Sequence, residues 1–293
     1  MGNWYQSLSI GTARFGVGYG LFSESSRISD EQLAKIFSVA KQHGVKHIDT
    51  STMYGDAEAR LGSLHLKNMQ ITSKVWAPTT REETQKIDFL FQIEKTLKRL
   101  KASEIHAVLI HNAHEIQPEL VAILISKLRL LKEKNLVKKI GVSCYESNQA
   151  IQIIQAADID ILQVPGNIFD RRLVNSGLLA LCNKREIEVH VRSIFLGGLL
   201  MRSTNQIPIV FNQWKKLLNH WQDWLSHEKI TQLQANMAFA RYLLEEGASK
   251  IIVGVGSAEE LLGILQSKDL LLSNWPISLI SEDRKLINPY NWQ

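Results

Sequence analysis

Three apolar stretches of the chain each end on an ionisable residue, and these residues are Asp49, Lys74 and His111. Tyr54 lies in the polar segment just after Asp49. A buried strand rarely finishes on a charged group unless its end opens into a site, because burying an unpaired charge is costly in free energy. We therefore expect these four side chains to form one catalytic cluster.

The four residue types in this cluster suit proton donation to a carbonyl oxygen. A free tyrosine, with a pKa of about 10, is a poor acid at neutral pH. The ammonium of Lys74 beside Tyr54 would stabilise the phenolate and lower that pKa, and Asp49 would hold the ammonium charged. His111 would hydrogen-bond the substrate oxygen. Because no protein side chain supplies hydride, carbonyl reduction at this cluster implies a nicotinamide cofactor.

The elements that must position the cluster are short runs rich in Ile and Val, separated by longer amphipathic stretches. The runs cover residues 8–12, 46–50, 70–75, 107–112, 139–143, 159–165, 188–193 and 250–255. Continuous apolar runs of about five residues are typical of parallel strands covered on both faces. Eight strands, each followed by a helix, predict a (β/α)8 TIM barrel in a single α/β domain over residues 1–293, with an open doubly wound sheet as the alternative.

Helical periodicity is clear between these strands. Leu33, Ile36, Phe37 and Ala40 are spaced for one helix face, and Gly44 ends the pattern. Similar spacing follows residues 118 and 257 and fills residues 232–245. Because the strands of a parallel barrel end on one face, the ends of the second, third and fourth strands would bring the catalytic candidates together.

One segment does not fit this alternation of strands and helices. Residues 211–225, between the seventh strand and its crossover helix, have apolar residues at positions 214, 217, 218, 221 and 225, which predicts an extra amphipathic helix after strand 7. One interpretation is a helix packed on the barrel wall. The other is a helix that borders the substrate entrance or a subunit contact, since an insertion after a barrel strand lies on the active-site face.

These motifs resemble those of the aldo-keto reductase superfamily. Residues 49–55 read Asp-Thr-Ser-Thr-Met-Tyr-Gly and, with Glu58, resemble the family signature Asp-Thr-Ala-x-x-Tyr-Gly-x-x-Glu. Residues 71–74 and 108–111 resemble the family's lysine and histidine strands. Residues 141–143, 162–164 and 251–257 resemble its Gly-Val-Ser-Asn stretch, its glutamine strand and the segment before the helix that binds the adenosine phosphate. The resemblance runs from about residue 8 to residue 265.

The resemblance implies an NAD(P)H-dependent carbonyl reductase with Tyr54 as proton donor. Lys74 and Asp49 would support that tyrosine, and His111 would orient the carbonyl. Ser143 and Gln163 would hold the nicotinamide carboxamide. The positions that it assigns to the cofactor are Thr12, Ser143, Gln163, Arg192, Ser193, Gly198, Gly254, Gly256 and Ser257. The sequences of residues 162–172 and 191–200 resemble those of bacterial family members whose genes lie near surface-polysaccharide genes. This resemblance hints at a sugar-derived substrate.

Several positions depart from the family pattern. Cys144 stands where the family usually has asparagine and cannot offer an amide's paired donor and acceptor. Arg192 stands where the family often stacks an aromatic ring on the nicotinamide, and an arginine plane can also stack.

At the adenosine end, Gly254 and Glu260 replace the lysine and arginine that NADPH-selective members commonly carry. Glu260 and its neighbour Glu259 would repel a 2′-phosphate unless a cation such as Lys250 or Lys268 offsets them. Because members of the family commonly use NADP(H), the resemblance still favours NADP(H) over NAD(H).

Bulk composition favours a cytoplasmic protein. The 293 residues carry a formal charge of +5 with a pI of about 9.1, but the densest basic groups, 95–101 and 132–139, fall at helix ends, where cations are expected. We therefore expect neither a nucleic-acid nor a membrane partner. The two cysteines, Cys144 and Cys182, lack metal-type spacing and suit a reducing compartment. No signal peptide is evident, and no apolar run approaches the roughly 18 residues that cross a bilayer.

Two rival functions remain open at this level. A metal-dependent hydrolase could use His47, Asp49, His111 and His190 as ligands, although the first strand lacks a His-x-His pair and Lys74 would have no role. Alternatively, the chain is a catalytically weak or inactive barrel that binds the cofactor and serves as a regulatory subunit.

Overall fold

Eight parallel strands close into a barrel in the order of the sequence. The computed structural model describes residues 4–17, 27–64, 66–267, 270, 272 and 274–292. The strands are β1 (Leu8–Gly11), β2 (His47–Asp49), β3 (Gln70–Val75), β4 (Ile105–Ile110), β5 (Val137–Ser143), β6 (Ile161–Pro165), β7 (Glu188–Arg192) and β8 (Lys250–Gly254). Because β1 pairs with both β2 and β8, the sheet has no free edge, which excludes the open doubly wound alternative.

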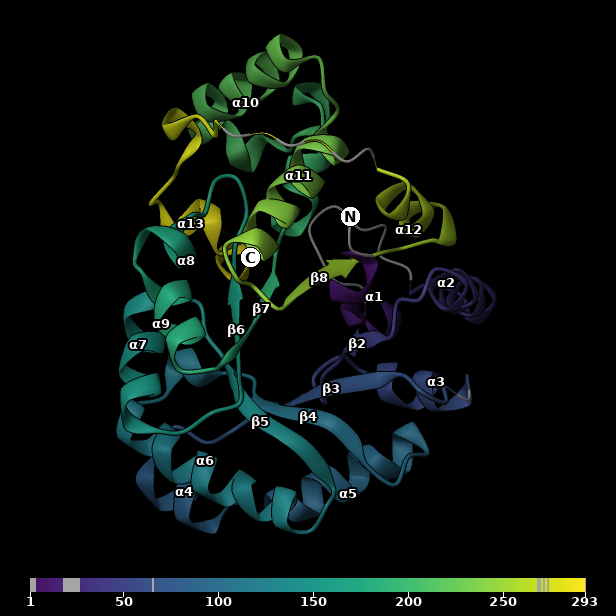
Figure 1. Ribbon diagram of the computed structural model, residues 1–293, viewed down its shortest axis with the longest axis vertical. Coiled ribbons are helices and arrows are strands. Elements are labelled where there is room, and N and C mark those ends of the chain that lie inside the picture. The colour runs from purple at the N-terminus through teal and green to yellow at the C-terminus, as the bar shows by residue number, and fades with distance from the viewer. Residues whose placement is uncertain are drawn as a thin grey trace.

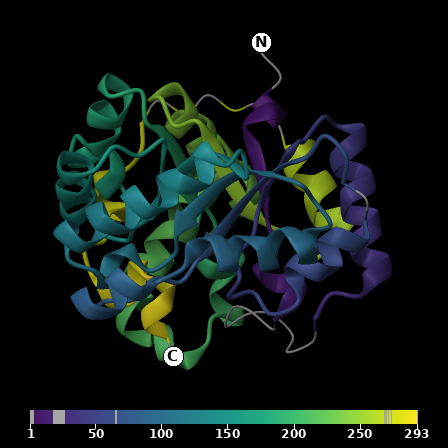
Figure 2. The same ribbon diagram turned by 90° about the horizontal axis from the view of Figure 1, so that it is seen from below.

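Helices surround this barrel, as the views of Figures 1 and 2 show from two directions. They are α1 (Ala13–Gly16), α2 (Asp30–Gln42), α3 (Ala57–Ser63), α4 (Arg81–Lys86), α5 (Phe89–Leu100), α6 (Pro118–Glu133), α7 (Ser147–Ala156), α8 (Arg172–Asn175), α9 (Leu178–Lys184), α10 (Lys215–Glu228), α11 (Gln232–Glu245), α12 (Ala258–Leu265) and α13 (Arg284–Ile287). None of those described is long and apolar enough to span a bilayer. The (β/α)8 barrel prediction is confirmed.

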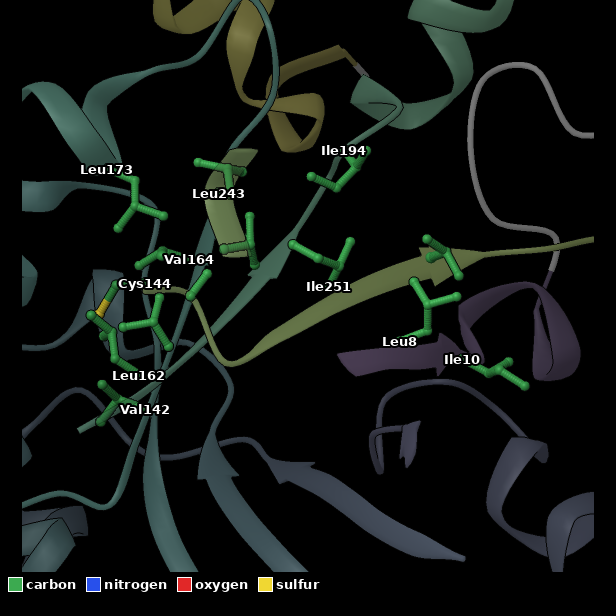
Figure 3. Close-up of a cluster of buried hydrophobic side chains, with 14 of the residues drawn as sticks. Leu8, Ile10, Val142, Cys144, Leu162, Val164, Leu173, Ile194, Leu243 and Ile251 are labelled. Carbon is green, nitrogen blue, oxygen red and sulfur yellow. The ribbon is translucent and has the colours of Figure 1, made fainter. Parts of the chain in front are cut away.

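Both faces of the strands are covered, which explains their continuous apolar sequences. All five residues of β6 are buried, and so are the last four residues of β4 and of β5. Figure 3 shows part of the layer between strands and helices, where Leu162 and Val164 of β6 lie in a cluster with Leu173 of α8 and Leu243 of α11. This packing holds the strand ends in fixed register.

Helix boundaries follow local sequence signals. Ser29 caps α2 by accepting a hydrogen bond from the Gln32 amide, and Gly44, with φ of 74°, lies just after the helix. Pro118 opens α6. Thr231 forms a capping box with Gln234 at the start of α11, which spans the predicted residues 232–245.

The extra helix after strand 7 is also present. A 3-10 helix (Ile209–Trp214) leads into α10, which buries Leu218, Trp221 and Trp224 on one face. The rings of Trp221 and Trp224 stack with centroids 5.5 Å apart, and Trp224 lies 6.0 Å from the ring of Trp275 in the C-terminal segment. The predicted packing role for this helix is therefore supported by burial of its apolar face.

Candidate active site

The catalytic candidates lie at the carboxyl ends of three adjacent strands. Asp49 ends β2, Lys74 is the penultimate residue of β3, and His111 directly follows β4. The His111 amide donates to the Val75 carbonyl at 2.8 Å, so the backbone that carries the imidazole is tied to β3. Tyr54 lies in the turn between β2 and α3. Parallel pairing thus brings all four residues to one mouth of the barrel.

Asp49 and Lys74 form a buried ion pair. The Lys74 Nζ donates to Asp49 Oδ1 at 2.5 Å and to the Thr50 carbonyl at 2.9 Å, and the two residues are only 4% and 1% exposed. Burial lowers the pKa of Lys74, and the charge and hydrogen bond of Asp49 oppose that shift. The second oxygen, Oδ2, accepts a 2.6 Å hydrogen bond from the Gln163 amide. The carboxylate is therefore fully engaged in orienting its partners.

Tyr54 and His111 lie against this pair. The Lys74 Nζ is 5.2 Å from the centroid of the Tyr54 ring. The Tyr54 and His111 rings meet edge to face, with centroids 5.7 Å apart and an interplanar angle of 86°. A phenol, an ammonium and an imidazole are thus adjacent, which is the arrangement needed to polarise one oxygen atom and deliver a proton to it.

His111 is a neutral imidazole near pH 7. Burial, with smaller contributions from Lys74 and Arg192, lowers its pKa to about 2. Its Nδ1 is 2.9 Å from the Ser51 hydroxyl. A neutral imidazole cannot act as a strong acid here, so its available chemistry is hydrogen bonding.

Two residues that sequence analysis did not single out complete this region. Ser51 contacts His111, and the indole of Trp76 lies 6.0 Å from the His111 ring and is 39% exposed. Trp76 also lines a surface cavity with residues 77–79, 83, 86 and 87. Trp76 directly follows β3, two residues after Lys74. This position at a strand end is the sequence feature that could have identified Trp76 as a site residue.

The expected carboxamide-binding residues lie on β5 and β6 beside the catalytic pair. The Ser143 hydroxyl donates to Gln163 Oε1 at 3.4 Å, and both residues are buried. Because the Gln163 amide also donates to Asp49, these polar groups are connected directly to the ion pair. Their donors and acceptors suit a carboxamide, which offers both kinds of group.

Cys144 does not replace the missing asparagine at the mouth. Its thiol is fully buried within the apolar cluster of Figure 3, and burial raises its pKa to about 12. Only its backbone serves the site: the Cys144 carbonyl accepts a 3.2 Å hydrogen bond from Arg192 Nη2. The Arg192 guanidinium lies 4.0 Å from the centroid of the Tyr145 ring, so it reaches from β7 to the loop after β5.

Three further residues of the predicted cofactor set follow β1 and β7. Thr12 is fully buried, and its hydroxyl donates to the Asp49 carbonyl at 3.0 Å, so it ties β1 to β2. The Ser193 hydroxyl lies 3.3 Å from Arg192 Nη1, and Gly198 adopts a φ of 97° at a kink in the 3-10 segment Leu196–Met201 that follows. Positive φ at that point suits glycine.

The adenosine end has an acidic side chain at the start of α12. The Ser257 hydroxyl caps the helix by accepting from the Glu260 amide at 3.2 Å, while Glu260 Oε2 accepts from the Gly256 amide at 2.6 Å. Arg14 Nη1 lies 3.5 Å from the same carboxylate oxygen. Gly254 is exposed, and a Cβ added there would meet no atom within 4 Å. The Gly256 N–H group and the Arg14 guanidinium could both bind an anion, but the Glu260 carboxylate already contacts both of them.

The cation at this position is Arg14, which sequence analysis missed. Lys250 cannot offset Glu260, because it begins β8 at the opposite end of the barrel, where its Nζ donates to the Gln6 carbonyl at 3.3 Å. Of the two lysines considered, Lys250 is therefore excluded, and Lys268 lies outside the described residues. Arg14 is far from α12 in sequence, and only the pairing of β1 with β8 brings the two together.

The proposed metal ligands do not assemble. His47 begins β2 at the opposite end of the barrel from His111, and the imidazole of His190, the middle residue of β7, lies 3.6 Å from the Glu188 carboxylate toward that same end. In the described parts of the chain, no three His, Cys, Asp or Glu residues form a group that could hold a metal ion. Both Asp49 oxygens are already bonded to Lys74 and Gln163. These placements do not support the hydrolase alternative.

The barrel with this constellation at its carboxyl end defines a known class of oxidoreductase. The chain matches the Aldo/keto reductase family over residues 7–282, and it belongs to that family. The family acts with a nicotinamide cofactor and is an NAD(P)-dependent oxidoreductase family in general.

Individual relatives are distant. A D-arabinose 1-dehydrogenase of Saccharomyces cerevisiae is 25% identical over 279 residues, which cover 87% of this chain and 82% of that protein. A thermostable aldo-keto reductase solved in complex with the inhibitor epalrestat is 26% identical, with a TM-score of 0.65 and coverage of 93% and 92%. A glycerol dehydrogenase from Gluconobacter oxydans shares the fold at 16% identity, with a TM-score of 0.68 and coverage of 91% and 88%.

Proposed function

We propose that the protein reduces an aldehyde or ketone to an alcohol with NAD(P)H, and that Tyr54 donates the proton. The observation that carries this proposal is the buried Asp49–Lys74 ion pair beside the Tyr54 ring, with the His111 ring against the same phenol. A charged ammonium next to a phenol stabilises the phenolate that remains after proton donation.

The residues present fit a nicotinamide cofactor. When bound, that cofactor supplies the hydride. Ser143 and Gln163 would hold its carboxamide, and Arg192 with Ser193 would line the neighbouring wall. Thr12 would act indirectly, by fixing the end of β2. The rest of the dinucleotide would be bordered by Gly198, Gly254, Gly256 and Ser257. We propose NADP(H) rather than NAD(H) because members of the family commonly use it.

A sugar-derived carbonyl compound is the substrate class that we favour. Two similar proteins carry names that refer to polyhydroxylated compounds, D-arabinose 1-dehydrogenase and glycerol dehydrogenase. We propose a small-molecule carbonyl substrate, action in the cytoplasm, and no nucleic-acid or membrane partner.

Replacing Tyr54 with phenylalanine tests the proposal. Loss of a general acid lowers turnover by at least about a hundredfold. We therefore expect Tyr54→Phe to lose that much kcat on a panel of aldehydes, ketones and sugars, while the dissociation constant for the reduced cofactor stays close to that of the wild type. Cofactor fluorescence measures binding, and absorbance of the reduced nicotinamide measures turnover.

Two outcomes would contradict the proposal. Unchanged turnover in Tyr54→Phe would remove the proton-donor role. Tight cofactor binding by the wild type without oxidation of the cofactor by any compound of the panel would instead favour the regulatory barrel, which the departures from the family pattern at Cys144 and at Glu260 support.

A further inference from the structure

Ser51 is a fully buried serine with three polar neighbours at the catalytic mouth. Its Oγ lies 2.9 Å from His111 Nδ1, 3.2 Å from the Lys74 carbonyl and 3.1 Å from the Met53 amide, which donates to it. The family signature has alanine at this position, so the hydroxyl is an addition in this chain. The direction of its single hydrogen atom decides how His111 can act.

The Lys74 carbonyl is already saturated. It accepts hydrogen bonds from the Thr52 amide at 2.9 Å and from the Thr52 hydroxyl at 3.1 Å. A carbonyl oxygen has two lone pairs, and both are taken by these donors. Of the two acceptors open to the Ser51 hydroxyl, the Lys74 carbonyl at 3.2 Å is therefore the poorer one, and His111 Nδ1 at 2.9 Å is the nearer one.

A neutral imidazole carries one hydrogen on its two ring nitrogens. If Nδ1 accepts from Ser51, the hydrogen is on Nε2. In the described parts of the chain, no side chain or backbone group is hydrogen-bonded to Nε2. A carbonyl oxygen is only an acceptor, so it can be bound by Nε2–H but not by an unprotonated Nε2.

We propose that Ser51 is a positioning residue that holds His111 in the tautomer with hydrogen on Nε2, so that His111 donates to the substrate carbonyl oxygen. The substrate contact rests on the proposed function, whereas the tautomer is a property of the protein alone.

The tautomer can be measured without substrate or cofactor. In the 15N-histidine-labelled protein, a protonated ring nitrogen and an unprotonated one resonate at well-separated positions, and His111→Gln identifies the His111 signals among the nine histidines. We expect protonated Nε2 and unprotonated Nδ1 in the wild type. In Ser51→Ala the Nδ1 resonance should shift, because it loses its hydrogen-bond donor, whereas Ser51→Thr should retain the wild-type position.

Kinetics then separate a positioning role from a purely structural one. Loss of one buried hydrogen bond corresponds to a change of about tenfold, so we expect kcat/KM to fall about tenfold in Ser51→Ala and to recover in Ser51→Thr, at unchanged cofactor affinity. Ser126→Ala, which removes an exposed hydroxyl from α6, serves as the matched control and should behave like the wild type.

Three results would overturn the inference: a wild-type His111 protonated on Nδ1, an Nδ1 resonance that is identical in Ser51→Ala, or an unchanged kcat/KM in that variant. A wild type that turns over no carbonyl compound would count against the proposed function, and the resonance measurements would still decide the tautomer.

Discussion

At the scale of single residues, the site depends on charges that are buried in pairs. Removing one member of a buried ion pair leaves an uncompensated charge, which is more costly than removing both. Asp49 and Lys74 are therefore constrained by stability as well as by chemistry, and the Gln163 amide extends the constraint to β6.

Asp49, Lys74 and His111 could be proposed as catalytic residues from the sequence because each one ends an apolar run, and Tyr54 because it lies in the polar segment after Asp49. Ser51 could not be recognised in this way, since a serine in a polar loop has many possible partners, and its role depends on the loop geometry that saturates the Lys74 carbonyl. Arg14 was missed for a similar reason: its partner Glu260 is reached only through barrel closure.

At the scale of elements, the strands were predicted to within two residues. The largest differences are of two residues: β4 begins at Ile105 and ends at Ile110, each two residues earlier than expected, β5 begins two residues earlier at Val137, and β6 begins two residues later at Ile161. The early residues include His106 and Lys138, whose polar side chains obscured the apolar pattern at the amino end of the barrel. Helix boundaries were better determined where capping residues were present, as in α11.

The start of α12 allows a test of cofactor preference. Replacing Glu260 with arginine removes the carboxylate that engages the Gly256 amide and adds a cation where a 2′-phosphate would lie. We expect the dissociation constant for NADPH to fall by about tenfold relative to that for NADH, as measured by cofactor fluorescence. Glu260→Gln, which keeps a hydrogen-bond acceptor but loses the charge, should show a smaller shift in the same direction. An unchanged ratio in Glu260→Arg would show that the phosphate does not lie there.

At the scale of the whole molecule, the two ends of the barrel carry different sets of polar side chains. The carboxyl end carries the cluster that we propose to be catalytic, and the amino end holds a group of titratable side chains to which we assign no catalytic role. These groups are His47, His106, Lys139, Glu188, His190 and Lys250. The His47 and His106 rings meet edge to face with centroids 6.1 Å apart.

This amino end should make the fold sensitive to acid. Burial lowers the pKa of His47 to about 3 and that of His106 to about 4, so both are neutral in the folded protein while the unfolded chain binds protons below its ordinary pKa of about 6.5. Stability therefore falls as the pH drops from about 6.5 toward 4, by at most about 1.4 kcal/mol per pH unit for each histidine and by less after solvent screening. Urea unfolding of wild type and His47→Gln at pH 7 and pH 5 measures this, and an equal loss in both proteins would contradict it.

The most direct test of the central claim is a double-mutant cycle of Tyr54→Phe and Lys74→Met, measured as kcat/KM for carbonyl reduction. If the ammonium acts by stabilising the phenolate, its loss matters little once the hydroxyl is gone. We predict that the double variant is about as slow as Tyr54→Phe alone. Losses that multiply independently would show that Lys74 and Tyr54 do not work as one acid.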